Sequence, residues 1–158
     1  MEGESMAEIP ESGLIQSEVV LREMMLTDEV KMTRKSLIRW LALSLGLISP
    51  KESRQSVLTL FEALLFYHLK DKRGANYTDI TEYFKQQNVE MNEKTIRYHL
   101  TQLRKAGVLE DGRGTYKFTG FQSENLGEAL EQSYKMKANT AFSNIKTAVD
   151  LLKKMHEA

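Results

Sequence analysis

The chain has 158 residues, and its 22 Lys and Arg balance 22 Asp and Glu, so its formal net charge at pH 7 is zero. This length allows one domain with an adequate core plus extensions, and the neutral balance excludes a general basic field that would hold nucleic acid unspecifically. Cysteine is absent, which excludes disulfides and thiolate metal sites. No signal peptide is recognisable, and the longest apolar run, Trp40 to Ile48, is too short to span a bilayer, so we expect a cytoplasmic protein.

The first 48 residues divide into a tail and a charged helical segment. Residues 1–13 are rich in glutamate and predict a disordered acidic tail. Residues 14–48 predict N-terminal helices, from Leu14 to Val30 and from Thr33 to Leu47, because apolar residues recur at helical spacing. Eight acids and one base precede residue 31, and four bases then follow without an acid. Three interpretations stay open: a clamp between two helices, an acidic segment that competes with DNA, or two solvated faces.

Residues 49–120 predict a separate domain. Ser49-Pro50-Lys51-Glu52 combines a serine cap, a proline in the first turn and a glutamate three residues on, which is typical of a helix start. The helix that follows is expected to run to about Lys70 and is apolar on much of its circumference, so it is predicted to be buried. A shorter helix, capped by Thr78, comes next.

The stretch from Met91 to Thr119 predicts a capped helix, a glycine stop and a hairpin. Asn92 is a good N-cap, and apolar residues at spacings of four and three give the helix one buried stripe. That stripe consists of Ile96, Leu100 and Leu103. Gly107 is placed to end the helix in the left-handed conformation. Two short strands then flank a turn at residues 111–114.

The opposite face of this helix carries groups that suit DNA. From Asn92 to Lys117 there are six Lys or Arg against three acids. Such donors bond base edges in a major groove, and such cations neutralise phosphates. The residues predicted to read or line the groove are Lys94, Thr95, Tyr98, Thr101 and Gln102. The residues predicted to contact phosphates are Arg97, Arg104, Lys105, Arg113 and Lys117, with Arg113 alternatively entering the minor groove. A solvated, mildly basic helix beside a hairpin is the plain alternative.

This stretch resembles the second half of winged helix-turn-helix DNA-binding domains. In that family a Thr/Ser-x4-Leu-x2-Leu-x3-Gly-hydrophobic pattern marks the recognition helix and the strand that leads into the wing. The matching positions are Thr95, Leu100, Leu103, Gly107 and Val108. The resemblance covers roughly Ser53 to Phe118 and implies a mainly α fold with a small β-hairpin wing. The stretch RKSLIRWLALSLGLISPKESR also resembles small archaeal transcription regulators, in particular activators of archaellum genes, and so implies promoter binding.

Residues 121–158 predict a long C-terminal helix that dimerises. From Ser123 to His156 no proline occurs, and apolar residues nearly keep the rhythm of a coiled coil, although Asn139 and Thr140 leave a break in the middle open. A helix of some thirty residues is about 45 Å long, more apolar stripe than a small domain covers. We expect it to pack on a symmetry mate, or else on the N-terminal helices. The predicted dimerisation residues are Leu130, Tyr134, Ala141, Ile145, Ala148 and Leu152.

No pattern of catalytic or cofactor-binding residues stands out. The histidines, His68, His99 and His156, have no second histidine or carboxylate at ligand spacing, so no metal site is expected. The Gly112-x-Gly114 pair is a turn, because no helix follows it. We therefore expect no enzyme and no cofactor.

The sequence predicts a transcription regulator that binds double-stranded DNA sequence-specifically as a homodimer. Two other functions stay open. One is a winged helix used as a protein-interaction module of the transcription machinery. The other is a ligand-responsive repressor, with a small-molecule effector bound in the dimer interface beside Trp40 or Phe142.

Overall fold

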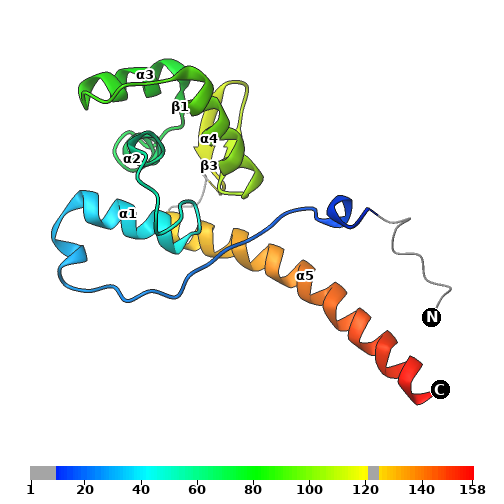
Figure 1. Cartoon of the computed structure of the whole chain (residues 1–158). Coiled ribbons are helices and arrows are strands. Elements are labelled where there is room, and N and C mark those ends of the chain that lie inside the picture. Colours follow the sequence, from blue (N-terminus) through cyan, green and yellow to red (C-terminus); the bar gives the residue numbers. More distant parts are fainter. Residues whose placement is uncertain (1–9, 121–124) are drawn as a thin grey trace.

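The computed structural model describes residues 10–120 and 125–158, so most of the predicted acidic tail lies outside the described residues. The described chain is mainly helical with a small antiparallel sheet, as predicted. Figure 1 shows α2 (Gln55–Leu69) in the middle, surrounded by α1 (Arg34–Ser44), α3 (Tyr77–Gln86), α4 (Glu93–Lys105) and the sheet. The long helix α5 (Leu126–Glu157) projects away from this group.

Helix α2 is the central buried helix, but it begins five residues later than the sequence predicted. Ser49 does not cap it: the Glu52 amide donates to the Ser49 carbonyl at 3.0 Å, which closes a turn. The Glu52 carboxylate then accepts from the backbone amide of Arg54 at 2.9 Å. The acidic member of the expected capping box is therefore engaged by Arg54, and the helix starts at Gln55. Most of its residues are buried, among them Leu60, which is fully inaccessible.

Helix α3 is capped by Asn76 rather than by Thr78, so the predicted cap is wrong. The Asn76 side chain accepts from the Asp79 amide at 2.8 Å, and the Asp79 carboxylate accepts from the Asn76 amide at 2.9 Å. This is a reciprocal capping box that satisfies two amides which the first turn leaves unpaired. The helix begins here because Asn76 also ends strand β1 (Ala75–Asn76), so the chain passes from strand to helix without a loop.

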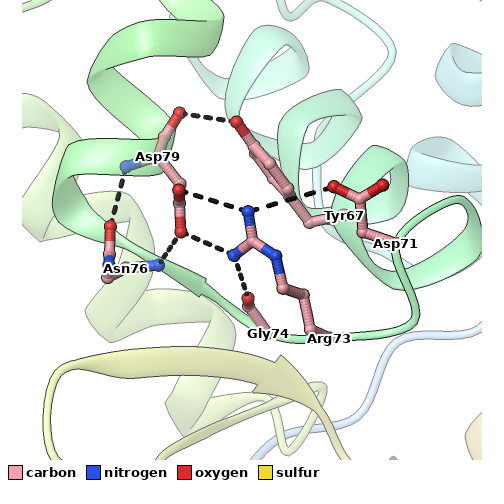
Figure 2. Close-up of polar contacts among 6 residues, drawn as sticks. All are labelled: Tyr67, Asp71, Arg73, Gly74, Asn76 and Asp79. Carbon is pink, nitrogen blue, oxygen red and sulfur yellow. Dashed lines mark hydrogen bonds and ion pairs between the residues drawn. The ribbon is translucent and has the colours of Figure 1, made fainter.

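Arg73 ties this helix start to α2 (Figure 2). Its guanidinium donates to both carboxylate oxygens of Asp79, at 2.8 and 3.3 Å, and lies over the Tyr67 ring at 4.6 Å from the centroid. The Tyr67 hydroxyl in turn donates to the Asp79 carbonyl at 3.1 Å. The hydrogen bonds from Arg73 and from the Asn76 amide hold the pKa of the Asp79 carboxyl below its usual range.

The Asp79→Asn variant is expected to lose about 1 kcal/mol of unfolding free energy at pH 7, because a neutral amide makes a weaker capping box and a weaker contact with Arg73. When folding lowers the pKa of a carboxyl, its carboxylate stabilises the fold at pH values above the unfolded pKa of about 3.9. This stabilisation is lost as the pH falls through the pKa of the folded state. Urea unfolding should therefore show the difference from wild type shrinking as the pH falls below about 3.9, the unfolded pKa, and through the lowered pKa of the folded state.

The control is Asp71→Asn, whose carboxylate lies 3.9 Å from Arg73 and is more exposed than that of Asp79. It is expected to change stability by less than about 0.5 kcal/mol. A constant difference between wild type and Asp79→Asn from pH 7 to pH 2 would contradict the role of the carboxylate charge.

The predicted capped helix and hairpin are confirmed. Asn92 accepts from the Thr95 amide at 3.0 Å, and Gly107 has a φ of 79°, the left-handed value that favours glycine. Strands β2 (Leu109–Asp111) and β3 (Thr115–Phe118) pair antiparallel. Strand β1, which the sequence did not predict because two residues show no periodicity, pairs with the other edge of β3 and gives the order β1-β3-β2.

One hydrophobic core joins these elements. Its fully buried large side chains come from α2, α3, α4 and the sheet. They include Leu60, Ile80, Phe84, Ile96, Leu100, Val108 and Phe118. The Phe61 and Phe118 rings meet edge to face at 6.1 Å between centroids, so β3 is packed directly on α2.

The helix predicted from Leu14 to Val30 does not form. The segment from Leu14 to Thr27 is extended instead, and it is called the strap below. Short 3-10 turns, η2 (Glu11–Leu14) and η3 (Val30–Met32), flank it. Its backbone bonds to α1 instead of to itself: the Arg22 amide donates to the Ser44 carbonyl at 2.8 Å. The Arg22 carbonyl accepts from the Ser44 hydroxyl at 3.1 Å. This exchange replaces the hydrogen bonds that a helix would have supplied.

Arg22 closes the C-terminal end of α1. Its guanidinium donates to the carbonyls of Leu43 at 2.6 Å and Ile48 at 3.0 Å. The last carbonyls of a helix lack partners within the helix and carry partial negative charge, so a cation stabilises them. Trp40 holds the other part of the strap by donating to the Met25 carbonyl at 2.8 Å, so it acts as a packing anchor.

The Gly46→Ala variant is expected to displace the strap. Gly46 has a φ of 73°, and an added Cβ would lie 2.5 Å from the Val20 Cβ and 2.7 Å from the Val20 carbonyl oxygen. We expect the Arg22 amide to exchange with solvent at least about tenfold faster, which corresponds to about 1.4 kcal/mol, because the strap must leave α1. The control is Gly13→Ala, whose Cβ would meet nothing within 4 Å. Unchanged protection in Gly46→Ala would contradict this packing.

Helix α5 is continuous through Thr140, so the break left open by the sequence does not form. The Thr140 hydroxyl donates to the Met136 carbonyl at 3.1 Å and is accommodated within the helix. Of the six predicted dimerisation residues, Leu130 and Tyr134 instead pack in the core of their own chain. The other four are exposed, as is every residue from 141 onwards: Ala141, Ile145, Ala148 and Leu152.

Candidate nucleic-acid interface

Helix α4 presents one continuous solvent-facing row of polar side chains. Its opposite stripe is fixed in the core, since Ile96, Leu100 and Leu103 are at most 5% exposed. Spacings of three and four residues place the row on one face of the helix. Lys94 and Tyr98 are exposed there and Thr101 is half-buried, while Arg97 is exposed on the flank of the row. Tyr98 is 56% exposed, an unusually open position for an aromatic ring with a polar tip.

Arg97 is oriented by its neighbours. Its Nε donates to the Glu93 carboxylate at 3.0 Å, and its guanidinium lies 4.4 Å from the centroid of the Tyr77 ring. Both Arg97 and Glu93 are more than half exposed, so solvent screens this pair and it contributes little to the stability of the fold. A phosphate could therefore replace the carboxylate at small energetic cost, with the Tyr77 ring still limiting the directions that the guanidinium takes.

The remaining predicted residues lie around this row rather than in it. Thr95 is half-buried, whereas Gln102 is exposed on a shoulder of the helix. Arg104 is 4.0 Å from the Asp111 carboxylate, which connects the end of α4 to strand β2. Lys105 is exposed, and its carbonyl accepts from the Lys137 ammonium of α5 at 3.4 Å.

The hairpin carries the other two predicted cations. Arg113 is exposed at the tip with a φ of 59°, and the Asp111 carboxylate fixes the turn by accepting from the Gly114 amide at 2.8 Å. Lys117 is half-buried on β3, the middle strand, so it is less accessible than the residues of the tip. The structure thus exposes Lys94, Arg97 and Tyr98 on α4 and Arg113 at the tip of the hairpin, whereas Lys117 is half-buried.

The strap borders the same helix. A groove of about 730 Å³ separates residues 15–18 and Val20 of the strap from the shoulder of α4 that carries Tyr98, Gln102 and Lys105. Glu18 and Arg54 also line it. Sequence reasoning missed Arg54, because this exposed cation precedes α2 in the chain and only the packing of α2 on α4 brings it there. An acidic strap residue and three polar residues of α4 therefore share one side of the candidate interface.

His99 is buried at the wall of this groove. It is 4% exposed, and its Nε2 has no hydrogen-bond partner among the described residues. Burial, with a smaller contribution from the Arg54 charge, lowers the pKa of His99 below its ordinary value. The ring is therefore neutral at pH 7, and we place it in the packing of α4 rather than in contact with a phosphate.

The described parts of the chain contain neither a metal-binding cluster nor a membrane-spanning helix. Residues 10–120 and 125–158 contain no group of three or more His, Asp or Glu side chains arranged to hold a metal ion. No helix within these ranges is long and apolar enough to cross a membrane. Comparisons with protein-family models, with curated proteins and with solved structures gave no match.

Proposed function

We propose that this chain is a winged helix-turn-helix protein that binds double-stranded DNA sequence-specifically and regulates transcription. The observation that carries the proposal is the two-sided construction of α4. One stripe is packed in the core, and the opposite side exposes a lysine, an arginine and a tyrosine to solvent. In this proposal α4 is the recognition helix and the β2–β3 hairpin is the wing.

The dimensions support this arrangement. Helix α4 has 13 residues and is therefore about 20 Å long, and a B-DNA major groove about 12 Å wide admits a helix. Lys94, Tyr98 and Thr101 would face base edges. Arg97 and Arg104 flank them and would contact phosphates, while Arg113 at the tip of the wing would reach the adjacent backbone or minor groove.

A homodimer is part of the proposal. The exposed half of α5 supplies an apolar surface outside the DNA-binding part of the chain. Two recognition helices related by a twofold axis would meet successive major grooves about 34 Å apart, and the operator would then contain two half-sites.

The test is selection of DNA fragments by the purified chain from a random library, with archaellum promoters as the first defined fragments. We expect an enriched motif with two half-sites and an affinity that falls steeply with salt, because bound cations release counterions from DNA. Retention of DNA only at low salt, without enrichment, would contradict the proposal. The alternative would then be a protein-interaction module, which the exposed apolar residues of α5 favour.

A further inference from the structure

A long apolar groove runs between the strap, α1 and the first half of α5. Its volume is about 1160 Å³. One wall comes from the strap, with Ile15, Val19 and Leu21. The other comes from α1 and its C-cap, with Leu41 and Leu45. Its floor is the stretch of α5 from Leu130 to Asn144. The strap wall is held in place, because Arg22 and Trp40 fix the strap on α1 by hydrogen bonds. Figure 1 shows the strap passing across α5.

The second half of α5 has an uncovered apolar stripe. Phe142, Ile145, Val149 and Leu152 follow one another at spacings of three, four and three, and each is 50–57% exposed. This is the spacing of the contact positions of a coiled coil. The stripe lies on the same side of the helix as Leu130 and Tyr134, which pack in the core, and begins eight residues after Tyr134.

We propose that the groove receives the second half of α5 from a second copy of this chain, with the two helices antiparallel. Each copy would then seat its tail, residues 145–155, opposite residues 134–144 of the other. Such an interface is isologous: one twofold axis fills both grooves and covers both stripes. A tail cannot fill its own groove, because α5 is one continuous helix from Leu126 to Glu157. This inference details the homodimer of the proposed function and rests on it.

The apolar area that each copy can bury reaches that of a stable dimer interface only if the strap contributes to it. The four stripe residues of the tail each offer on the order of 100 Å², or about 400 Å² together. Four strap residues, Leu14, Ile15, Val19 and Leu21, are 38–67% exposed and add a similar area. The sum of about 800 Å² per copy is what a standard stable interface buries on each side. The tail alone would give half of that.

The pairing rests on apolar contact and not on charge. The charged residues that line the groove are Glu131, Lys135 and Lys137, a formal charge of +1. Residues 141–158 contain three lysines, Lys146, Lys153 and Lys154, against Asp150 and Glu157, a formal charge that is also +1. The association is therefore carried by the apolar lining of the groove and the apolar stripe of the tail. The groove is also larger than the 300–1,000 Å³ of typical small-molecule sites and is open to solvent, which suits a helix.

The orientation can be measured directly, because the chain has no cysteine and accepts a single labelled one. A spin label at Lys154→Cys should give an intermolecular distance of about 30 Å, since residue 154 lies ten residues from the expected axis near residue 144 in each copy. A parallel coiled coil would bring the two labels within about 15 Å and would overturn the proposal, as would a chain that stays monomeric at micromolar concentration.

The role of the strap needs a second measurement. Val19→Asp in the strap and Ile145→Asp in the tail should each weaken dimerisation at least about tenfold in sedimentation equilibrium, because each buries a charge in the apolar interface. The matched control is Met25→Asp: Met25 is 82% exposed on the strap and does not line the groove. Loss of the dimer in Ile145→Asp but not in Val19→Asp would show tails pairing without the strap and would overturn the proposal. Native mass spectrometry that finds a monomer with a bound small molecule would do the same.

The measurements distinguish failure of the antiparallel dimer from failure of DNA binding. The Ile145→Asp variant retains α4 and the hairpin, so it should still bind a half-site weakly while it sediments as a monomer. If fragment selection succeeds and the label distance is short, only the antiparallel interface is wrong. If selection fails and the distance is about 30 Å, the dimer stands without the DNA-binding function.

Discussion

The Lys94→Ala/Arg97→Ala/Tyr98→Ala variant is expected to bind the selected DNA at least about 100-fold more weakly than the wild-type chain, which corresponds to about 2.7 kcal/mol. A well-placed contact to a base edge discriminates by about 1–3 kcal/mol, and each lost phosphate contact lowers the salt slope by about one. We therefore also expect the slope of log affinity against log salt concentration to be smaller by one to two in the variant. Fluorescence anisotropy titrations at several salt concentrations measure both quantities.

The fold should survive these three substitutions, because all three side chains are exposed and outside the core. The matched control is Lys31→Ala/Lys35→Ala, which removes the same two charges. Lys31 and Lys35 are also exposed, and Lys31 is 3.9 Å from Asp28, much as Arg97 is paired with Glu93. The control should lose less than about threefold in affinity. An equal loss in both variants would show that overall charge, and not the face of α4, binds DNA.

The Tyr134→Ala variant is expected to lower the free energy of unfolding by about 3–5 kcal/mol, the second large effect. Tyr134 is 8% exposed, and its hydroxyl donates to the Leu45 carbonyl at 2.6 Å. Removing the ring leaves a cavity between α5 and α1 and a carbonyl without its partner. Because this residue connects α5 to the rest of the chain, we expect α5 to loosen before α4 does.

Urea unfolding gives the stability, and hydrogen exchange resolves the order of loosening. Tyr134→Phe keeps the ring and loses only the hydroxyl, so it should cost about 1–2 kcal/mol. Asn139→Ala, an exposed position one turn further along α5, should cost less than about 0.5 kcal/mol. If Tyr134→Ala were as stable as Asn139→Ala, the docking of α5 on α1 would be wrong.

The sequence by itself determined the part of the chain that the proposal uses most. Asn92, Gly107 and the apolar stripe of α4 act through neighbours within four residues, so a cap, a stop and a buried face could be read without tertiary information. The hairpin was predictable for the same reason. Its turn depends on Asp111 and on glycines next to it, and the predicted strands β2 and β3 followed.

Only the tertiary structure decided the strap, the start of α2 and the state of the α5 stripe. Leu14 to Thr27 has a helix-like apolar pattern, but the partners of Arg22 are carbonyls more than twenty residues away, and bonding to them requires an extended chain. The local start signal at Ser49 does not begin α2. The Glu52 carboxylate accepts from the nearby Arg54 amide, and the Glu52 carbonyl accepts from the Arg39 guanidinium of α1 at 3.1 Å. Leu130 and Ile145 belong to one apolar stripe, yet α1 covers the first and leaves the second exposed. Periodicity shows that a face is apolar, and distant segments decide what covers it.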